Sequence, residues 1–235
     1  VSNSQRTRRR TFPSTSRTVE SSATAAWTVG WGFSSLCDLN CAFCYSSRAR
    51  DRTSDVFTLQ TARSFLERNA RVLSALNFGT GEPCADEWFP ELVELVREVV
   101  PRCGIAVTTN GALADRSGTD AHRIVSGIDE IDISIDMASE TEHDRWRGTA
   151  GTFRRALRAL ALSREARLPR TVVMVGTRQT RVPERLRGMV DLARSCGAAL
   201  RVNLYMPVTK RKGFLPDTAQ VLASLDELRR LSRAV

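Results

Sequence analysis

Three cysteines are crowded into eight residues near the start of the chain. Cys37, Cys41 and Cys44 are separated by three and then two residues, so one loop can present all three thiols to a metal centre. Thiolates are preferred ligands of iron–sulfur clusters. A structural zinc site wants a fourth ligand, and the sequence has no second close cysteine pair and only two histidines, His122 and His143. Three ligands leave one iron of a four-iron cluster open, which favours catalysis over zinc or simple burial.

A glycine-rich turn provides a second set of candidate ligand-binding residues. Gly79, Thr80, Gly81 and Glu82 are followed directly by Pro83. Glycine lets the backbone approach a ligand closely, and a carboxylate at such a point is suited to pairing with an amine. The turn has no lysine and lacks the spacing of a phosphate-binding P-loop. A phosphate-binding role for this turn is therefore disfavoured.

Further polar residues follow predicted strands or lie near them. Ser134 and Asp136 stand two apart on a predicted strand and should point the same way, and Asn110 follows another strand. Cys84 is a candidate hydrogen donor or spare ligand, although a lone cysteine is more often a buried apolar residue. His143, on a predicted polar loop, is a candidate acid–base group; a hydrogen bond within that loop is the alternative.

The elements around these residues alternate between short β-branched runs and stretches of helical period. Predicted strands cover 27–33, 75–78, 105–109, 131–136, 171–177 and 200–206, and predicted helices cover 59–72, 87–99, 122–125, 153–162, 183–193 and the chain from about 218. Successive βα units imply a parallel sheet with helices outside, either an open doubly wound sheet or a curved partial barrel. Both place ligands at the carboxyl ends of the strands, where the candidate residues fall.

Composition limits the class of protein. The 235 residues are 42% hydrophobic and 26% charged, which predicts a folded core, and no apolar stretch approaches the roughly 20 residues that cross a bilayer. Residues 1–25 are rich in Ser, Thr and Arg and predict a flexible basic arm before a core domain at 26–235. No secretory signal precedes the core, so a cytoplasmic location is expected. The net charge of +9 favours acidic partners without naming one.

Taken together, the motifs resemble those of the radical S-adenosylmethionine (SAM) superfamily. The shared features are the cysteine spacing with Phe43 before the last cysteine, the 79–83 turn after the second strand, Thr-Thr-Asn-Gly at 108–111 and the strand at 132–136. The resemblance runs from about Trp27 to the end. It implies a (β/α)6 partial TIM barrel in which Cys37, Cys41 and Cys44 bind three irons of a [4Fe-4S] cluster. SAM would chelate the fourth iron and be cleaved reductively to a 5′-deoxyadenosyl radical, which abstracts hydrogen from a C–H bond.

The same resemblance assigns residues to SAM. They are Phe43, Gly79, Thr80, Gly81, Glu82, Asn110, Ser134, Asp136 and Arg147. Glu82 would pair with the amino group of SAM, Ser134 and Asp136 would reach the ribose hydroxyls, and Phe43 would lie against the adenine. Asn110 and Arg147 are candidates for binding the carboxylate. On the helix that follows, Arg154, Arg155 and Arg158 are predicted to form a solvated face.

A further segment bears on the substrate. His-Asp-Arg-Trp-Arg-Gly at 143–148 resembles the branch of the superfamily that includes peptide- and protein-modifying maturases. Members of that branch usually carry a cysteine-rich C-terminal extension, called SPASM or twitch, with auxiliary clusters. Here Cys84, Cys103 and Cys196 are scattered, so the chain either stops before such an extension or lacks auxiliary clusters.

The expected substrate is a ribosomally made peptide or protein. The alternative is dehydrogenation or epimerisation of an aminoglycoside or other sugar natural product, and RNA is a third possibility that the basic charge permits. An electron donor such as flavodoxin or ferredoxin is expected. A non-catalytic iron–sulfur or zinc-binding protein is the rival from another class.

Overall fold

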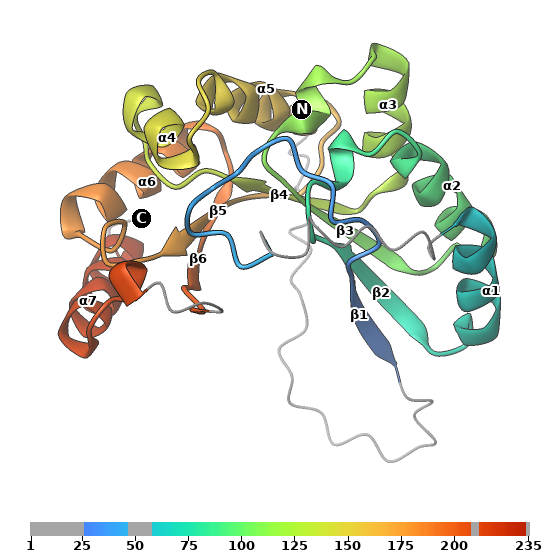
Figure 1. The fold of residues 1–235 in the computed structure, drawn as a ribbon, viewed down its shortest axis with the longest axis horizontal. Helices are drawn as coiled ribbons and strands as arrows, with labels where there is room; N and C mark the ends of the chain where they lie inside the picture. Colours follow the sequence, from blue (N-terminus) through green and yellow to red (C-terminus); the bar gives the residue numbers. More distant parts are fainter. Residues whose placement is uncertain (1–25, 47–57, 208–211, 234–235) are drawn as a thin grey trace, which may run out of the picture.

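The computed structural model describes residues 26–46, 58–207 and 212–233; the predicted arm at 1–25 lies outside them. Six strands form one parallel sheet in the order of the sequence: β1 (Trp27–Trp31), β2 (Leu73–Phe78), β3 (Gly104–Thr109), β4 (Glu130–Ser134), β5 (Arg170–Gly176) and β6 (Ala199–Leu204). The sheet curls into an open half-barrel (Figure 1). The strand order never reverses, as it does in a doubly wound sheet. The partial barrel is therefore confirmed.

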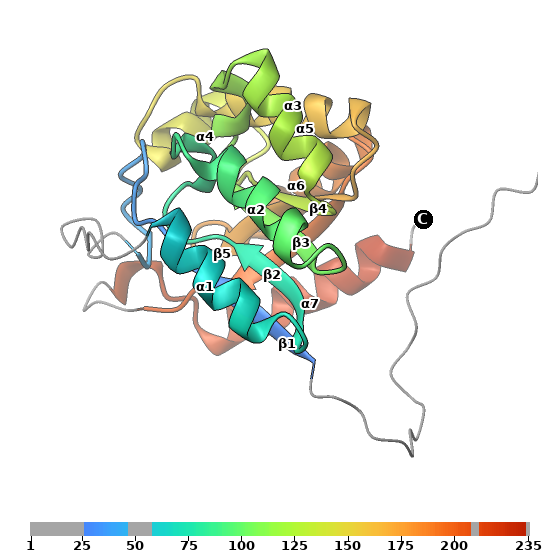
Figure 2. The same cartoon turned by 90° about the vertical axis from the view of Figure 1, so that its right-hand side faces the viewer.

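Helices cover the outer side of the sheet (Figures 1 and 2). They are α1 (Leu59–Asn69), α2 (Phe89–Val99), α3 (Gly118–Gly127), α4 (Glu140–Arg147), α5 (Thr152–Glu165), α6 (Pro183–Ser195) and α7 (Thr218–Arg233), with short 3-10 turns η2 (Pro83–Ala85), η3 (Ala112–Asp115) and η4 (Lys212–Phe214). No described helix is long and apolar enough to cross a membrane.

Strand alternation separates the core from the inner surface of the half-barrel. On β4, Ile131 and Ile133 are fully buried in the main core between sheet and helices. Ser134 lies on the opposite face and lines a cavity. Because side chains alternate along a strand, the residues that hold the core and those that meet a ligand are interleaved on the same strands.

Helix α4 replaces the polar loop predicted around His143. Ser139 caps its start, accepting a hydrogen bond from the Glu142 backbone N–H at 3.4 Å, and Gly148 ends it in the left-handed region with φ 77°. Its buried side chains, His143 and Arg147, are both polar. The helix therefore shows no apolar period in the sequence, and the loop prediction is wrong.

Candidate active site

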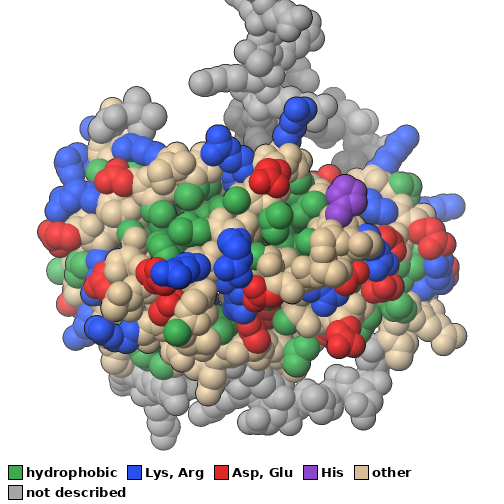
Figure 3. All heavy atoms as spheres, turned by 90° about the horizontal axis from the view of Figure 1, so that it is seen from above, with side chains coloured by type: hydrophobic (Ala, Val, Ile, Leu, Met, Phe, Trp, Pro, Cys, Tyr) green, Lys and Arg blue, Asp and Glu red, His purple; other side chains and the backbone are tan. Residues whose placement is uncertain are grey.

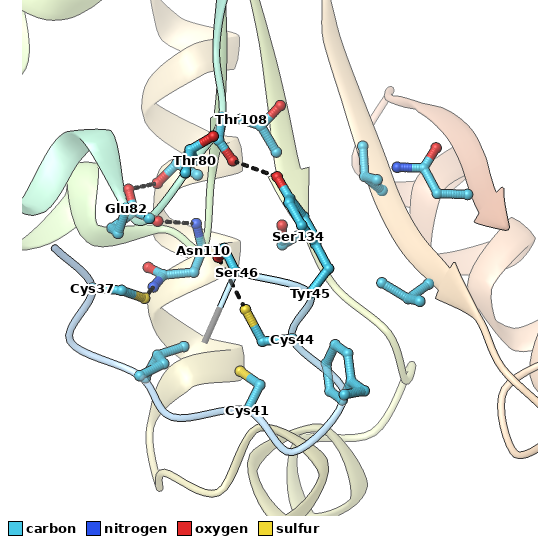
Figure 4. Close-up of a pocket in the computed structure, with 18 of the residues that line it drawn as sticks. Cys37, Cys41, Cys44, Tyr45, Ser46, Thr80, Glu82, Thr108, Asn110 and Ser134 are labelled. Carbon is cyan, nitrogen blue, oxygen red and sulfur yellow. Dashed lines mark hydrogen bonds between the residues drawn. The ribbon is translucent and has the colours of Figure 1, made fainter. Parts of the chain in front are cut away.

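A cavity of about 1010 Å³ opens at the carboxyl ends of the strands, a volume at the upper end for ligand pockets. The three thiols of Cys37, Cys41 and Cys44 line it (Figure 4). The structure brings these further predicted residues to the same cavity: Phe43, Gly79, Thr80, Gly81, Glu82, Asn110, Ser134 and Arg147. Cys84, Asp136 and His143 are not among the residues that line it.

Gly81 sets the distance between the glycine-rich turn and the cysteine loop. Its φ of 68° lies in the left-handed region, and an added Cβ would stand 2.4 Å from the carbonyl oxygen of Leu36. The backbone N–H of Glu82 donates to that same oxygen at 2.6 Å. Only glycine allows this approach, which fixes the backbone just before Cys37 against the end of β2.

Glu82 joins the turn to the end of β3. Its side chain is buried and accepts hydrogen bonds from Thr109 Oγ1 at 2.6 Å, from the Asn110 backbone N–H at 2.5 Å and from the Cys84 backbone N–H at 3.1 Å. Burial raises the pKa of Glu82 to about 7, against the opposing effect of these hydrogen bonds. Glu82 also contributes to the lining of the cavity.

The side-chain amide of Asn110 is hydrogen-bonded to other residues of the chain at both ends. Its Nδ2 donates to Asp38 Oδ1 at 2.8 Å and approaches Cys37 Sγ at 3.9 Å. Its Oδ1 accepts from Arg155 Nη2 at 2.8 Å and from the Ala112 backbone N–H at 3.1 Å. With both ends of the amide in use, the geometry favours a role in holding the cysteine loop over the expected contact with the SAM carboxylate.

Asp136 lies just beyond β4, which ends at Ser134. The Asp136 carboxylate is held by two partners. Its Oδ1 accepts from the Val175 backbone N–H at 2.8 Å, and its Oδ2 pairs with Arg147 Nη2 at 2.6 Å. The side chain is fully buried. Of the two, only Ser134 lines the cavity, and the joint contact of both side chains with one ligand stays a prediction.

Arg147 connects this carboxylate to the cysteine loop. Its guanidinium lies 5.4 Å from the centre of the Phe43 ring. Burial lowers the pKa of Arg147, but the charges of Asp136 and Cys41 outweigh burial and raise it overall. Phe43 also stacks on Trp146, with ring centres 4.9 Å apart. Phe43 is largely covered by the protein but still contributes to the lining of the cavity.

His143 and Cys84 lie behind the cavity. His143 Nδ1 accepts a hydrogen bond from the Asp136 backbone N–H at 3.2 Å, and burial, followed by the charge of Arg147, lowers the pKa of His143 to about 4. Cys84 is fully buried in the main core, and burial raises the pKa of its thiol. The geometry gives each a packing or positioning role and does not support the catalytic roles expected from the sequence.

Comparison with known proteins decides the family. Residues 31–190, more than half of the chain, match the profile of the Radical SAM superfamily. The chain belongs to this superfamily. Radical SAM proteins use a [4Fe-4S] cluster and SAM, so the resemblance and both cofactors predicted from the sequence are confirmed at the level of the family.

Individual relatives extend this result. The chain is 31% identical over 205 residues to the PqqA peptide cyclase of Gluconobacter oxydans, covering 85% of this chain and 54% of the relative. It is 26% identical over 185 residues to the AdoMet-dependent heme synthase of Methanosarcina barkeri, covering 78% of this chain and 51% of the relative. It shares the fold of Streptococcus suis SuiB bound to S-adenosylmethionine, with a TM-score of 0.72 and 16% identity over 88% of this chain and 47% of that one. The chain thus spans about half the length of these proteins.

The donors present fit the cofactors of a radical SAM protein. Within the described ranges, no group of three His, Cys, Asp or Glu residues converges closely enough for a single metal ion, although all three loop thiols line one cavity. Thiols spread around a cavity suit a cluster, whose ligands attach to separate irons, better than one zinc ion. Arg147 Nε is buried without a hydrogen-bond partner among the described residues, as expected of a donor awaiting an anionic group.

The segment at 143–148 has a local structural explanation. The Asp144 carboxylate accepts from the backbone N–H groups of Gly151 at 2.6 Å and Phe153 at 2.8 Å, and from Thr152 Oγ1 at 2.8 Å. It thereby caps the start of α5. Together with His143 and the Arg147–Asp136 pair, it fixes the corner between α4, α5 and the end of β4. The motif therefore has a structural role that does not depend on the substrate.

Sequence reasoning missed the polar inner surface of the half-barrel. Asn77, Thr108, Arg201 and Asn203 line the cavity, and Arg201 pairs with the buried Asp132, which also accepts from Thr108 Oγ1 at 3.4 Å. The signal was present in the sequence: these polar residues stand at alternate positions of otherwise apolar strands. An inward-facing polar set of this kind is expected where parallel strands surround a ligand.

Proposed function

We propose that this chain is the radical SAM core of an enzyme that modifies a ribosomally made peptide or protein. The observation that carries the proposal is its 31% identity with a peptide cyclase over 85% of this chain. The similarity to a heme synthase favours a non-peptide substrate as the second candidate. An aminoglycoside or other sugar natural product belongs to that second class.

When bound, the cluster and SAM would supply the 5′-deoxyadenosyl radical that takes hydrogen from a C–H bond of the substrate. The chain contributes the positions of the groups involved. Cys37, Cys41 and Cys44 would hold the irons, and Arg147 and Glu82, which both line the cavity, would orient charged groups of SAM. Leu39, Phe43 and Tyr205 are buried in one apolar cluster with Cys41 and shield that thiol, whereas Cys37 and Cys44 are partly exposed.

The proposed substrate position is the part of the cavity beside β6. Arg201, Asn203 and Tyr205 line the cavity from this strand and the residue just after it, and Leu204 and Met206 are strongly exposed at its rim. Apolar rim residues beside inward polar groups suit a chain with mixed side chains. The reaction needs one electron at low potential, for which a cytoplasmic flavodoxin or ferredoxin is the proposed donor.

Anaerobic reconstitution with iron and sulfide tests the enzyme class. After addition of dithionite and SAM, we expect about four irons per chain and formation of 5′-deoxyadenosine. Cys41→Ala should lose both, and Cys103→Ala should lose neither, because Cys103 lies in the main core away from the cavity. About eight irons would indicate an additional cluster. Zinc without SAM cleavage would favour the non-catalytic rival.

Deuterium transfer tests the substrate class. Peptide, sugar and RNA fractions from cells grown in deuterated water are each incubated with the reconstituted protein, SAM and reductant. Hydrogen abstraction places one deuterium in 5′-deoxyadenosine, which mass spectrometry detects. We expect the mass increase with the peptide fraction. An increase with the sugar or RNA fraction alone would contradict the proposed substrate and leave the enzyme class standing.

A further inference from the structure

Asp38 ties the cysteine loop to a distant helix. It follows Cys37 directly, and its carboxylate forms an ion pair with Arg155 on α5, 117 positions away in the sequence. Asp38 also accepts from Asn110 Nδ2 at 2.8 Å. One carboxylate in the middle of the cysteine loop is thus held from two other elements of the half-barrel.

Arg155 departs from the solvated helix face that the sequence predicts. Its side chain is only 12% exposed, whereas those of its neighbours Arg154 and Arg158 are 72% and 57% exposed. Its guanidinium binds Asp38 through Nη1 and Asn110 Oδ1 through Nη2 at 2.8 Å. The planar guanidinium presents two donors in a fixed geometry, so a single side chain sets the positions of both partners.

Asn110 connects Arg155 to Cys37, the first cysteine of the loop. Its Oδ1 receives two donors, from Arg155 and from the Ala112 backbone N–H, so the amide cannot be turned over without placing its N–H groups against other N–H groups. The Nδ2 end must therefore face Asp38 and Cys37 Sγ, which lies 3.9 Å away. Figure 4 shows Asn110 beside Cys37 at the edge of the cavity.

Gly111 makes the arrangement possible. It has φ 102°, and a Cβ on it would stand 2.8 Å from the backbone of Ala156, directly after Arg155. The glycine lets helix α5 pack against the turn that follows Asn110. Without that close approach, the guanidinium would not reach both the amide and the cysteine loop.

We propose that Arg155 is a positioning residue for the cluster, acting through Asp38 and Asn110 to fix Cys37 and to direct an N–H group at its sulfur. Hydrogen bonds to cluster sulfurs stabilise the more negative, reduced state and raise the reduction potential. The arrangement would therefore make the cluster both better retained and easier to reduce. This inference rests on the cofactors of the superfamily and is independent of the substrate.

The first test compares Arg155→Lys with Arg158→Gln in the reconstituted protein. Lysine keeps the positive charge but lacks the planar guanidinium that binds two partners at fixed positions. We expect Arg155→Lys to release iron to a chelator about tenfold faster and to show a more negative midpoint potential in an EPR-monitored titration. Arg158 pairs with Asp115, as Arg155 also does, but it forms no ion pair with the described part of the cysteine loop. Its variant should match the wild type in both measurements.

A second variant separates the sulfur contact from the ion pair. Asn110→Leu keeps the side-chain volume and leaves Arg155 and Asp38 free to pair, but it removes the N–H that faces Cys37. We expect the potential to become more negative with a smaller effect on iron release. Urea unfolding of each metal-free variant checks that the fold is intact.

Two outcomes would overturn the inference. In the first, Arg155→Lys and Asn110→Leu both keep the wild-type potential and rate of iron release. In the second, Arg158→Gln shifts them as much as Arg155→Lys, which would reduce Arg155 to an ordinary helix ion pair. SAM cleavage is measured in parallel, so that loss of the whole radical SAM activity is distinguished from a change at the cluster alone.

Discussion

Two buried ionisable residues near the cavity respond to pH in opposite directions. Burial raises the pKa of Glu82 to about 7 and lowers that of His143 to about 4, because in each case it disfavours the charged form. Protonation of His143 destabilises the fold, and deprotonation of Glu82 does the same. In the wild-type protein the two effects offset each other between about pH 4.5 and 6.5.

The variant His143→Gln should reveal the effect of His143 protonation on the free energy of unfolding. The unfolded chain binds a proton at this histidine below its ordinary pKa of 6.5, whereas the folded chain does so only near 4. The contribution of His143 to stability is therefore present above pH 6.5 and is lost as pH falls toward 4. We expect the difference in unfolding free energy between wild type and variant to shrink by about 3 kcal/mol over that range. Urea unfolding of the metal-free protein at several pH values measures it; a constant difference would contradict the prediction.

The variant Glu82→Gln should show the opposite pH dependence of stability. The folded carboxyl keeps its proton up to about pH 7 and the unfolded one only to about 4.5, so its contribution is present at low pH and is lost as pH rises through 7. The variant also places an amide N–H₂ where the carboxylate accepts three donors, which costs about 1–3 kcal/mol at every pH. The net destabilisation should therefore be greatest at low pH. The same unfolding series tests this, and equilibrium dialysis should show weaker SAM binding by the reconstituted variant.

At the scale of elements, two glycines control how the cysteine loop and α5 meet the sheet. Gly81 and Gly111 both have positive φ and backbone atoms within 3 Å of an added Cβ. Gly118, in helix α3, has open space instead. The comparison separates glycines that position the site from one that only weakens a helix.

Gly81→Ala should destabilise the fold, and Gly118→Ala should not. The first introduces left-handed strain and a clash with the Leu36 carbonyl oxygen, which we expect to cost about 3 kcal/mol in unfolding free energy. It should also reduce iron retention, because the displaced backbone leads directly to Cys37. Gly118→Ala should gain up to about 1 kcal/mol. Equal unfolding midpoints for the two variants would be inconsistent with a close approach at Gly81.

The same elements show how far the sequence predicts this fold. All six strands are predicted within a few residues, because their short apolar runs are strong local signals, and the cysteine loop and glycine turn follow from local spacing. Helix α4 is missed since its buried face is made of His143 and Arg147. The partners of Asp38 and Asn110 are missed as well, because Arg155 comes from a helix that only tertiary packing brings to the loop. Long-range polar contacts leave no periodic trace in a single sequence.

At the scale of the whole molecule, the basic surplus lies mostly outside the described half-barrel. Residues 1–25 hold five arginines and one glutamate, 47–57 hold three arginines and two aspartates, and 208–211 add Lys210 and Arg211. These segments account for +7 of the +9, so the described residues carry +2. On the face shown in Figure 3, basic and acidic side chains are interspersed. The half-barrel itself therefore gives no electrostatic support for the RNA alternative.

Inside the half-barrel, one charge pair spans the sheet from β4 to β6. Asp132 is nearly fully buried, and its partner Arg201 is about half exposed to the cavity, at 45%. Arg201→Gln leaves a buried carboxylate without its cation, which we expect to cost about 2 kcal/mol, less than for a fully buried pair because water reaches this side. Asp132→Asn combined with Arg201→Gln removes both charges and should recover more than half of that loss. A double-mutant cycle by urea unfolding measures the coupling. A coupling near zero would mean that the pair does not stabilise the contact between β4 and β6, and that Arg201 is free for a ligand.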